Sequence, residues 1–115
     1  MAELTLVEAN DAFTHVALRG RLDAVGTGAV DLGLTSHTVA RGKPAIVDLT
    51  EVPFIASLGI GMLLQVARSL AKRGAQAVAV APHEPVRGVL RLMQLGELLP
   101  VVATREEALR TLGLE

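Results

Sequence analysis

The stretch Ala45–Leu64 changes its hydrophobic period partway along, and this constrains the fold more than any other segment does. Ala45–Leu49 is an apolar run too short for a typical helix, and Gly42 and Pro44 precede it. From Leu58 onward the apolar residues recur every three or four positions, as on one face of an amphipathic helix. The stretch therefore predicts a buried strand, a connecting loop and a helix that packs on a core.

The residues around this helix mark its ends. Pro53 lacks an N–H and pushes Val52 away from helical geometry, so both belong to the loop. Lys72 and Arg73 suit a last turn, where the helix dipole favours cations, and Gly74 suits a C-terminal cap. The helix positions expected to face the core are Ile60, Leu63, Leu64, Ala67, Leu70 and Ala71.

Ser57 directly precedes the predicted helix. Its hydroxyl suits an N-cap, because it can accept a hydrogen bond from an otherwise unpaired N–H of the first turn. The same position suits phosphorylation, since the helix dipole favours a phosphate, which adds about 1.5 to 2 negative charges. The two roles are compatible, and by residue type alone the cap is the more common one.

The N-terminal part of the chain predicts a hairpin followed by a helix. Apolar residues alternate from Leu4 to the turn at Asn10, and Thr14–Gly20 alternates again with Val16 and Leu18 inward. The next segment has apolar residues near helical spacing, although its glycines and threonines weaken the pattern. That predicted helix spans Thr27–Arg41.

The C-terminal part repeats the alternation of strand and helix. Thr104 and Glu107 have the spacing of a capping box, which predicts the start of a terminal amphipathic helix that contains Ala108, Leu109 and Leu112. The other predicted elements are a strand at Ala75–Ala81, a short helix through Val86 and Met93 with Pro85 at its first position, and a strand at Val101–Ala103.

This order of elements predicts one α/β domain over residues 1–115. Strands that alternate with helices imply right-handed crossovers and a mainly parallel sheet, here with an antiparallel hairpin at its start. The sequence therefore predicts a mixed, mainly parallel β-sheet with an N-terminal β-hairpin and about four α-helices. A chain of 115 residues, 50% of them hydrophobic, suffices for one core.

Composition excludes several classes of function. The formal net charge is −1 and Lys and Arg form no stripe, so the electrostatic footprint of a nucleic-acid binder is missing and a protein partner is favoured. With no cysteine, the chain has no disulfide, thiolate metal site or cysteine nucleophile. The N-terminus lacks the layout of a secretory signal, and no apolar run approaches the roughly 20 residues of a membrane span. We expect a cytoplasmic protein with no direct membrane insertion and no cofactor or metal.

The remaining candidate motifs do not predict an enzyme. Gly59 and Gly61 suggest a dinucleotide loop, but no third glycine follows at the required spacing and the pair does not directly follow a strand. Close helix packing is the simpler use of these glycines. The histidines lie far apart, without metal-ligand spacing or a plausible pairing with a serine. They are His15, His37 and His83, expected to be ordinary surface or strand residues.

The element order, together with three local segments, resembles the STAS family, which includes bacterial anti-sigma factor antagonists. Gly20–Asp23 resembles the family's Gly-x-Leu-Asp after the second strand. Val47–Gly61 resembles its central segment, an Asp-Leu and a loop ending Phe-hydrophobic-Asp-Ser-Ser/Thr-Gly-Leu-Gly. Glu97–Val101, followed by Glu106–Leu109, resembles its C-terminal end. The resemblance covers nearly the full length of the chain.

The resemblance implies a STAS-like fold and a mechanism. By position Ser57 is the phosphoacceptor of the phosphorylation-switched members, whose partner is an anti-sigma factor with serine kinase activity. Without phosphate such a protein binds the anti-sigma factor and frees the sigma factor, and phosphate ends the binding. The family pattern also places Asp23 close to the serine loop, whereas residue type alone favours a turn residue that caps the next helix.

Two residues depart from the family pattern. Ala56 stands where the aspartate is expected, and Leu58 replaces the small polar residue after the phosphoacceptor. An apolar Leu58 at a helix start, near Met62 one turn on, suits a drier, more permanent interface. The alternative function is therefore a non-phosphorylated STAS subunit of a multiprotein complex, such as a lipid-transport ATPase; a small-ligand sensor has no positive sign in the sequence. The predicted partner-binding residues are Asp23, Ala56, Ser57, Leu58, Gly59, Ile60 and Met62.

Overall fold

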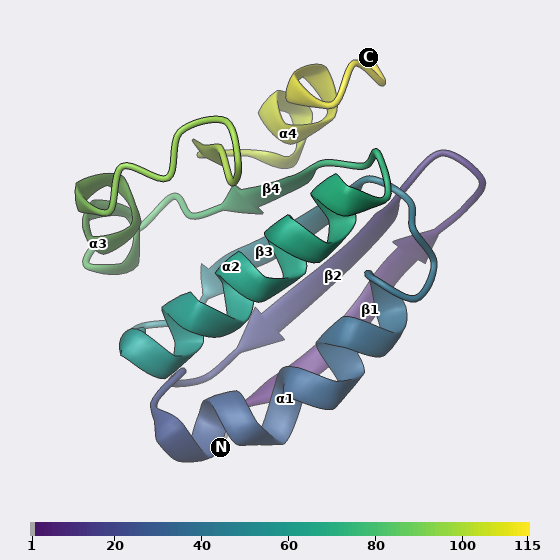
Figure 1. Cartoon of the computed structure of the whole chain (residues 1–115). Coiled ribbons are helices and arrows are strands. Elements are labelled where there is room, and N and C mark those ends of the chain that lie inside the picture. Colours follow the sequence, from purple (N-terminus) through teal and green to yellow (C-terminus); the bar gives the residue numbers. More distant parts are fainter. Residues whose placement is uncertain (1) are drawn as a thin grey trace.

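The computed structural model describes residues 2–115 and folds them into a mixed sheet with helices on both faces (Figure 1). The order of strands and helices is the one predicted from the sequence. The elements are β1 (Glu3–Ala9), β2 (Thr14–Arg19), α1 (Ala24–His37), β3 (Ala45–Glu51), α2 (Ser57–Lys72), β4 (Ala77–Val80), α3 (Val86–Leu92), β5 (Val101–Val102) and α4 (Arg105–Thr111).

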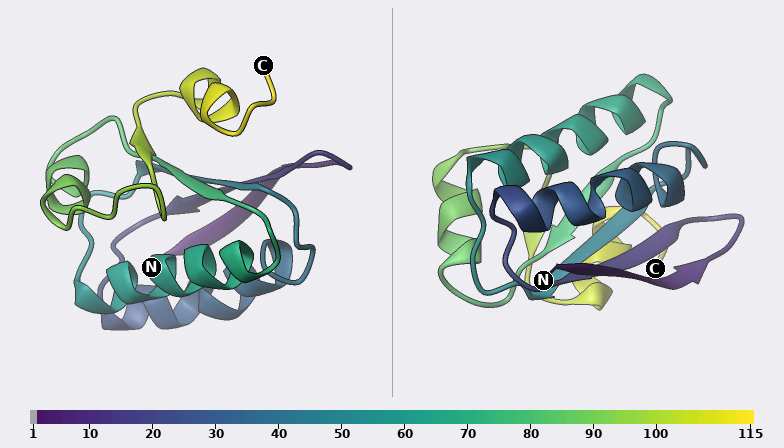
Figure 2. Two further views of the ribbon diagram at one scale, coloured as in Figure 1. Left: turned by 45° about the horizontal axis from the view of Figure 1, so that its top comes forward. Right: turned by 90° about the horizontal axis from the view of Figure 1, so that it is seen from below.

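The sheet has five strands among the described residues, in the order β1-β2-β3-β4-β5. β1 and β2 form the predicted antiparallel hairpin, and each later strand pairs with its predecessor in parallel. Helices α1 and α2 lie side by side on one face of the sheet, and α4 lies on the other (Figure 2). Because β2, β3, β4 and β5 are parallel, their carboxyl ends meet at one edge, where α1 and α2 begin.

Two apolar cores hold these layers together. The larger core lies between the sheet and α1 and α2, and it includes Val16, Val47 and Leu63. The smaller core lies under α4 and includes Ile46 and Val78. Ile46 and Val47 point to opposite faces and both are buried, which explains why β3 has a continuous apolar run rather than an alternating one. Each fully buried side chain of this size contributes roughly 1.5–3 kcal/mol.

Several predicted boundaries are corrected. α1 begins at Ala24 rather than Thr27, because the Asp23 side chain caps it, and it ends at His37 rather than Arg41. Pro85 is the N-cap of α3, one position before its first helical residue. In α2, the sequence predicts that Ala71 faces the core, but it is exposed. The predicted capping box of α4 is confirmed, since Thr104 Oγ1 accepts a hydrogen bond from the Glu107 N–H at 3.1 Å.

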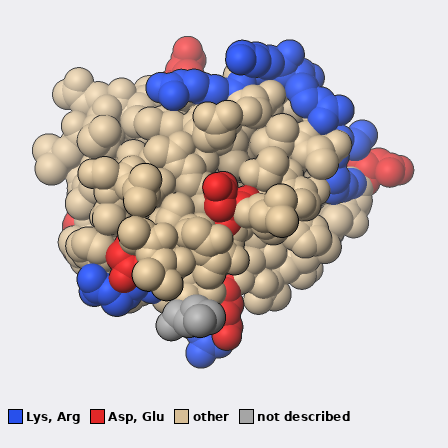
Figure 3. All heavy atoms as spheres, turned by 60° about the horizontal axis from the view of Figure 1, so that its bottom comes forward, with Lys and Arg blue, Asp and Glu red and all other residues tan. Residues whose placement is uncertain are grey.

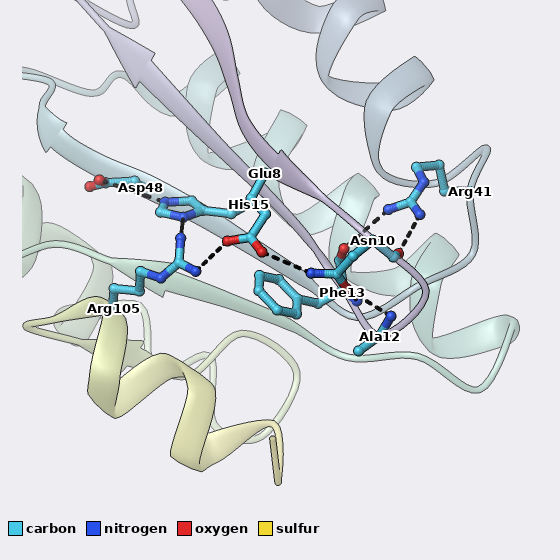
Figure 4. Close-up of polar contacts among 8 residues, drawn as sticks. All are labelled: Glu8, Asn10, Ala12, Phe13, His15, Arg41, Asp48 and Arg105. Atoms are coloured by element: carbon cyan, nitrogen blue, oxygen red, sulfur yellow. Dashed lines mark hydrogen bonds and ion pairs between the residues drawn. The ribbon is translucent and has the colours of Figure 1, made fainter. Parts of the chain in front are cut away.

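A polar cluster ties α4 to the sheet (Figure 4). Arg105, the first residue of α4, donates from Nη1 to His15 Nδ1 at 2.7 Å and from Nη2 to Glu8 Oε1 at 2.5 Å. On the far side of the ring, His15 Nε2 lies 3.9 Å from Asp48 Oδ2. A guanidinium only donates, so Nδ1 accepts and the neutral ring carries its proton on Nε2, facing Asp48. The cluster connects β1, β2, β3 and α4.

The burial of His15 corrects the prediction that this side chain faces outward. Its exposed fraction is only 4%, because α4 and Arg105 cover the second face of β2. Hydrogen bonding to Arg105 lowers the pKa of Glu8. Burial alone would raise the pKa of Asp48, but the neighbouring His15 ring and the hydrogen bonds from Thr50 lower it overall. Both carboxylates therefore carry negative charge at neutral pH and hold the cluster together.

Candidate protein-binding site

Two loops meet at the carboxyl edge of the sheet, where α1 and α2 begin. Residues 52–57, here called the serine loop, lie against the short segment between β2 and α1. The Leu22 N–H donates to the Phe54 carbonyl at 2.9 Å, and the Ala56 N–H donates to the Leu22 carbonyl at 3.0 Å. This pairing, a parallel bridge between Leu22 and Ile55, places Asp23 beside the serine loop.

Arg21 and Phe54, which are not among the predicted site residues, add a side-chain contact between these two segments. The Arg21 guanidinium lies 4.3 Å from the centroid of the Phe54 ring. Its Nε also lies 3.7 Å from Asp23 Oδ2, although both side chains are substantially exposed. An exposed ion pair of this kind contributes little to stability, because water screens it. Their positions inside the segments Gly20–Asp23 and Val47–Gly61 were the signal in the sequence that could have identified them.

Asp23 serves as the helix cap that its residue type predicted. Its Oδ1 accepts a hydrogen bond from the Gly26 N–H at 2.8 Å, at the start of α1. That hydrogen bond is the main reason why the pKa of Asp23 lies below its usual value, and the nearby Arg21 lowers it further. The carboxylate is therefore charged at neutral pH. Capping α1 and lying beside the serine loop are compatible in this geometry.

Ser57 is the first residue of α2 rather than its N-cap, which corrects the simpler interpretation of this serine. The N-cap position belongs to Ala56, whose extended backbone (φ −99°, ψ 176°) is held by its bond to Leu22. A methyl side chain has no acceptor, and in residues 2–115 no side-chain hydrogen bond caps this helix. Ser57 itself is exposed. Its hydroxyl thus lies at the surface, beside first-turn N–H groups that no side chain caps.

The other predicted contact residues differ in their accessibility. Leu58 is 61% exposed, which is unusual for a leucine, and Ala56 is half-buried. Ile60 and Met62, in contrast, point into the larger core. The exposed part of the predicted surface is therefore Ser57 and Leu58, with Ala56 and Asp23 at its border.

Gly59 is buried where the two loops pack closely. A Cβ added there would lie 2.8 Å from Ile55 Cγ1 and 3.0 Å from the Leu22 carbonyl oxygen. Close packing, the simpler interpretation of this glycine, is therefore confirmed. Gly61 differs, because an added Cβ would meet nothing within 4 Å.

A shallow hollow of about 430 Å³ borders the serine loop. It lies between this loop and the segment that joins β4 to α3. The residues that line the hollow are Thr50, Glu51, Val52, Pro53, His83 and Glu84.

Two other features are absent from the described part of the chain. Across residues 2–115, no cluster of three His, Cys, Asp or Glu side chains is arranged to hold a metal ion. None of the helices described is long and apolar enough to cross a membrane.

Comparison with known proteins shows the family. The model of the STAS domain matches residues 5–108, so this chain belongs to the STAS domain family. An anti-sigma factor antagonist from Mycobacterium paratuberculosis is 26% identical, with a TM-score of 0.82 over 96% of this chain and 95% of that one. A putative anti-sigma factor antagonist from Thermotoga maritima is 19% identical, with a TM-score of 0.80 over 96% and 93%.

The fold is also that of the Bacillus cell fate determinant SpoIIAA. Its phosphorylated form is 22% identical to this chain, with a TM-score of 0.69 over 94% of this chain and 97% of that one. At this level of identity the likeness concerns the fold. The STAS resemblance that the sequence motifs suggested is thus confirmed, and so is the α/β architecture that it implied.

Proposed function

We propose that this protein is an anti-sigma factor antagonist-like regulator, which binds an anti-sigma factor with serine kinase activity and is switched by phosphorylation of Ser57. The observation that carries the proposal is the exposed serine at the uncapped start of α2, within a STAS domain similar to known anti-sigma factor antagonists. In this proposal the chain acts by binding, and the kinase activity belongs to its partner.

The local chemistry supports a switch at this position. A phosphate on Ser57 adds about 1.5 to 2 negative charges next to Leu58, an apolar side chain that a partner would cover. Transferring that charge from water into an apolar contact carries a large desolvation cost, so the phosphorylated form binds more weakly. Before the partner docks, the helix dipole and the first-turn N–H groups stabilise the phosphate.

The alanine at position 56 does not remove this chemistry. A polar N-cap side chain accepts a hydrogen bond from the N–H groups of the first turn and so competes with a phosphate for them. Ala56 cannot compete, so these donors are free to bind a phosphate on Ser57. We therefore keep Ser57 as the phosphoacceptor, with Asp23, Ala56 and Leu58 in the footprint of the partner.

The test begins with the partner's identity and then changes the serine. Proteins that copurify with the chain from its native host are identified, and a histidine-kinase-like ATPase is expected. Titration of that purified protein should show Ser57→Ala within about twofold of wild type and Ser57→Asp weakened by about tenfold or more. Tenfold corresponds to about 1.4 kcal/mol, which the desolvation of a carboxylate beside Leu58 should exceed. Equal affinity of the two variants contradicts the switch.

The exposed Leu58 favours a second candidate, a STAS subunit held permanently in a transporter complex. An apolar residue that is 61% exposed beside the serine suits an interface that never opens. This candidate predicts copurification with a transporter ATPase and no phosphate on Ser57 in an intact-mass measurement. The identity of the copurifying ATPase separates the two candidates.

A further inference from the structure

Helix α1 is apolar on the side that faces away from the core. Its inward side is already complete, because Val30 and Leu34 are buried in the larger core. On the outward side, Val25 is 74% and Leu32 is 81% exposed, and the exposed Ala29 lies between them at helical spacing. Exposed apolar side chains that are grouped on one side of a helix normally mark a surface that another molecule covers. We call Val25, Ala29 and Leu32 the α1 outer face.

Few charged residues lie around the α1 outer face, and the charges at one end of it are positive. Asp31 is the single Asp, Glu, Lys or Arg within α1. Figure 3 shows that charged side chains are sparse over this helix, whereas Lys and Arg gather toward the C-terminal ends of α1 and α2. The exposed residues Arg68, Lys72 and Arg73 of that end, here called the basic end, make no ion pair within residues 2–115.

The basic end is fixed relative to α1. The Arg73 guanidinium donates to the carbonyl oxygens of Val39 and Ala40 at 2.5 and 3.2 Å, just beyond the end of α1. At the opposite end of the helix, Asp23 caps α1 beside the serine loop, so Val25 lies two residues from the proposed docking site. One surface therefore runs from the serine loop along α1 to the basic end.

We propose that the partner that docks at Ser57 extends across the α1 outer face, with apolar side chains on Val25, Ala29 and Leu32 and acidic side chains against the basic end. This inference rests on the proposed function and names the rest of the partner's footprint. Apolar burial at the centre and opposite charges at the rim are the usual anatomy of a protein interface.

Two other occupants fit the surface less well. A second copy of the chain brings the same basic end and only one acidic residue on its own α1, so it offers little charge complementarity. The basic end would attract a membrane of anionic lipid, but Asp31 beside the α1 outer face would be repelled, and α1 has no aromatic residue to anchor at the interface. A protein with an apolar centre and an acidic rim satisfies both parts of the surface.

The test titrates the purified serine-kinase anti-sigma factor with two matched leucine variants. Leu32→Asp should weaken binding about tenfold or more, while Leu92→Asp on α3 stays within about twofold. The two leucines have nearly equal exposure, 81% and 82%, so circular dichroism melting should show both variants folded. Arg68→Glu combined with Lys72→Glu should weaken binding and flatten its salt dependence, while Arg91→Glu on α3 should not.

The outcomes separate this inference from the proposed function. If Ser57→Asp abolishes binding and Leu32→Asp matches Leu92→Asp, the footprint on α1 is wrong and the serine switch stands. If Ser57→Asp binds as wild type does, both proposals fail. Dimerisation of the chain alone in sedimentation, or binding to phosphatidylglycerol vesicles, overturns the inference if Leu32→Asp abolishes it.

Discussion

Polar side chains are paired with one another in the polar cluster around Arg105, whereas at the serine loop a polar side chain is left at the surface. In the cluster, Arg105 is shared between His15 and Glu8, and these contacts join α4 to the sheet. At the serine loop, Ser57 is exposed at a helix start that no side chain caps, with the exposed Leu58 beside it. Polar groups that are paired inside the molecule hold the fold, whereas an unpaired polar group beside an exposed apolar residue is available to another molecule.

Alanine substitutions at Gly59 and Gly61 compare a close-packed position at the serine loop with an open one. Gly59→Ala has the largest expected effect on stability. Gly59→Ala should lower the free energy of unfolding by about 1–3 kcal/mol, because overpacking forces Ile55 and Leu22 apart. Gly61→Ala is the matched control in the same helix. It should raise stability by about 0.5–1 kcal/mol, because alanine favours the helix and the site is open. Urea unfolding measures both, and equal destabilisation would contradict the packing.

Arg105→Ala tests whether the cluster is structural, with a somewhat smaller effect. Loss of the guanidinium leaves the buried Nδ1 of His15 without its donor, which should cost about 1–2 kcal/mol of unfolding free energy. Ser57→Ala, and Arg110→Ala at an exposed position of α4, should each change the free energy of unfolding by about 0.5 kcal/mol or less. If thermal or urea unfolding finds Ser57→Ala as damaging as Arg105→Ala, the contrast between the two regions is wrong.

The pH dependence of stability gives the smallest effect. The pKa values of Glu8 and Asp48 lie below their ordinary values of 4.5 and 3.8 in the folded protein. The stability that these two carboxylates contribute is therefore fully present above their ordinary pKa values. It is lost as the pH falls through their lower pKa values in the folded protein. Urea unfolding should show stability falling on acidification below the ordinary values, and Glu8→Gln with Asp48→Asn should reduce that fall. An unchanged acid slope in the double variant contradicts the account.

The order of elements could be predicted because its signals are local. Turn residues, hydrophobic period and the capping box of Thr104 each act within a few positions, and the structure confirms the resulting sequence of strands and helices. The predicted start of α1 at Thr27 is too late, because glycines and threonines weaken the helical pattern, although Asp23 is a correct cap signal. At this boundary the local cap outweighs the weak helical pattern.

The rest depends on contacts between distant residues. His15 is buried because Arg105, 90 positions away, covers it, and a single strand's alternation contains no such information. Similarly, Ser57 lies one position inside the helix because Ala56 bonds to Leu22, a pairing between separate loops. The motifs identified Ser57, Leu58 and Asp23 as candidates, but the core positions of Ile60 and Met62 required the packed structure.

The most direct test of the central claim compares the unmodified protein with the same protein phosphorylated on Ser57 by its own kinase. Isothermal titration measures the affinity of each form for the purified anti-sigma factor, with circular dichroism as the check that both are folded. We expect tight binding without phosphate and binding weakened by about tenfold or more with it. Equal affinity of the two forms would contradict the serine switch. So would the finding that the serine kinase that binds this chain does not phosphorylate Ser57.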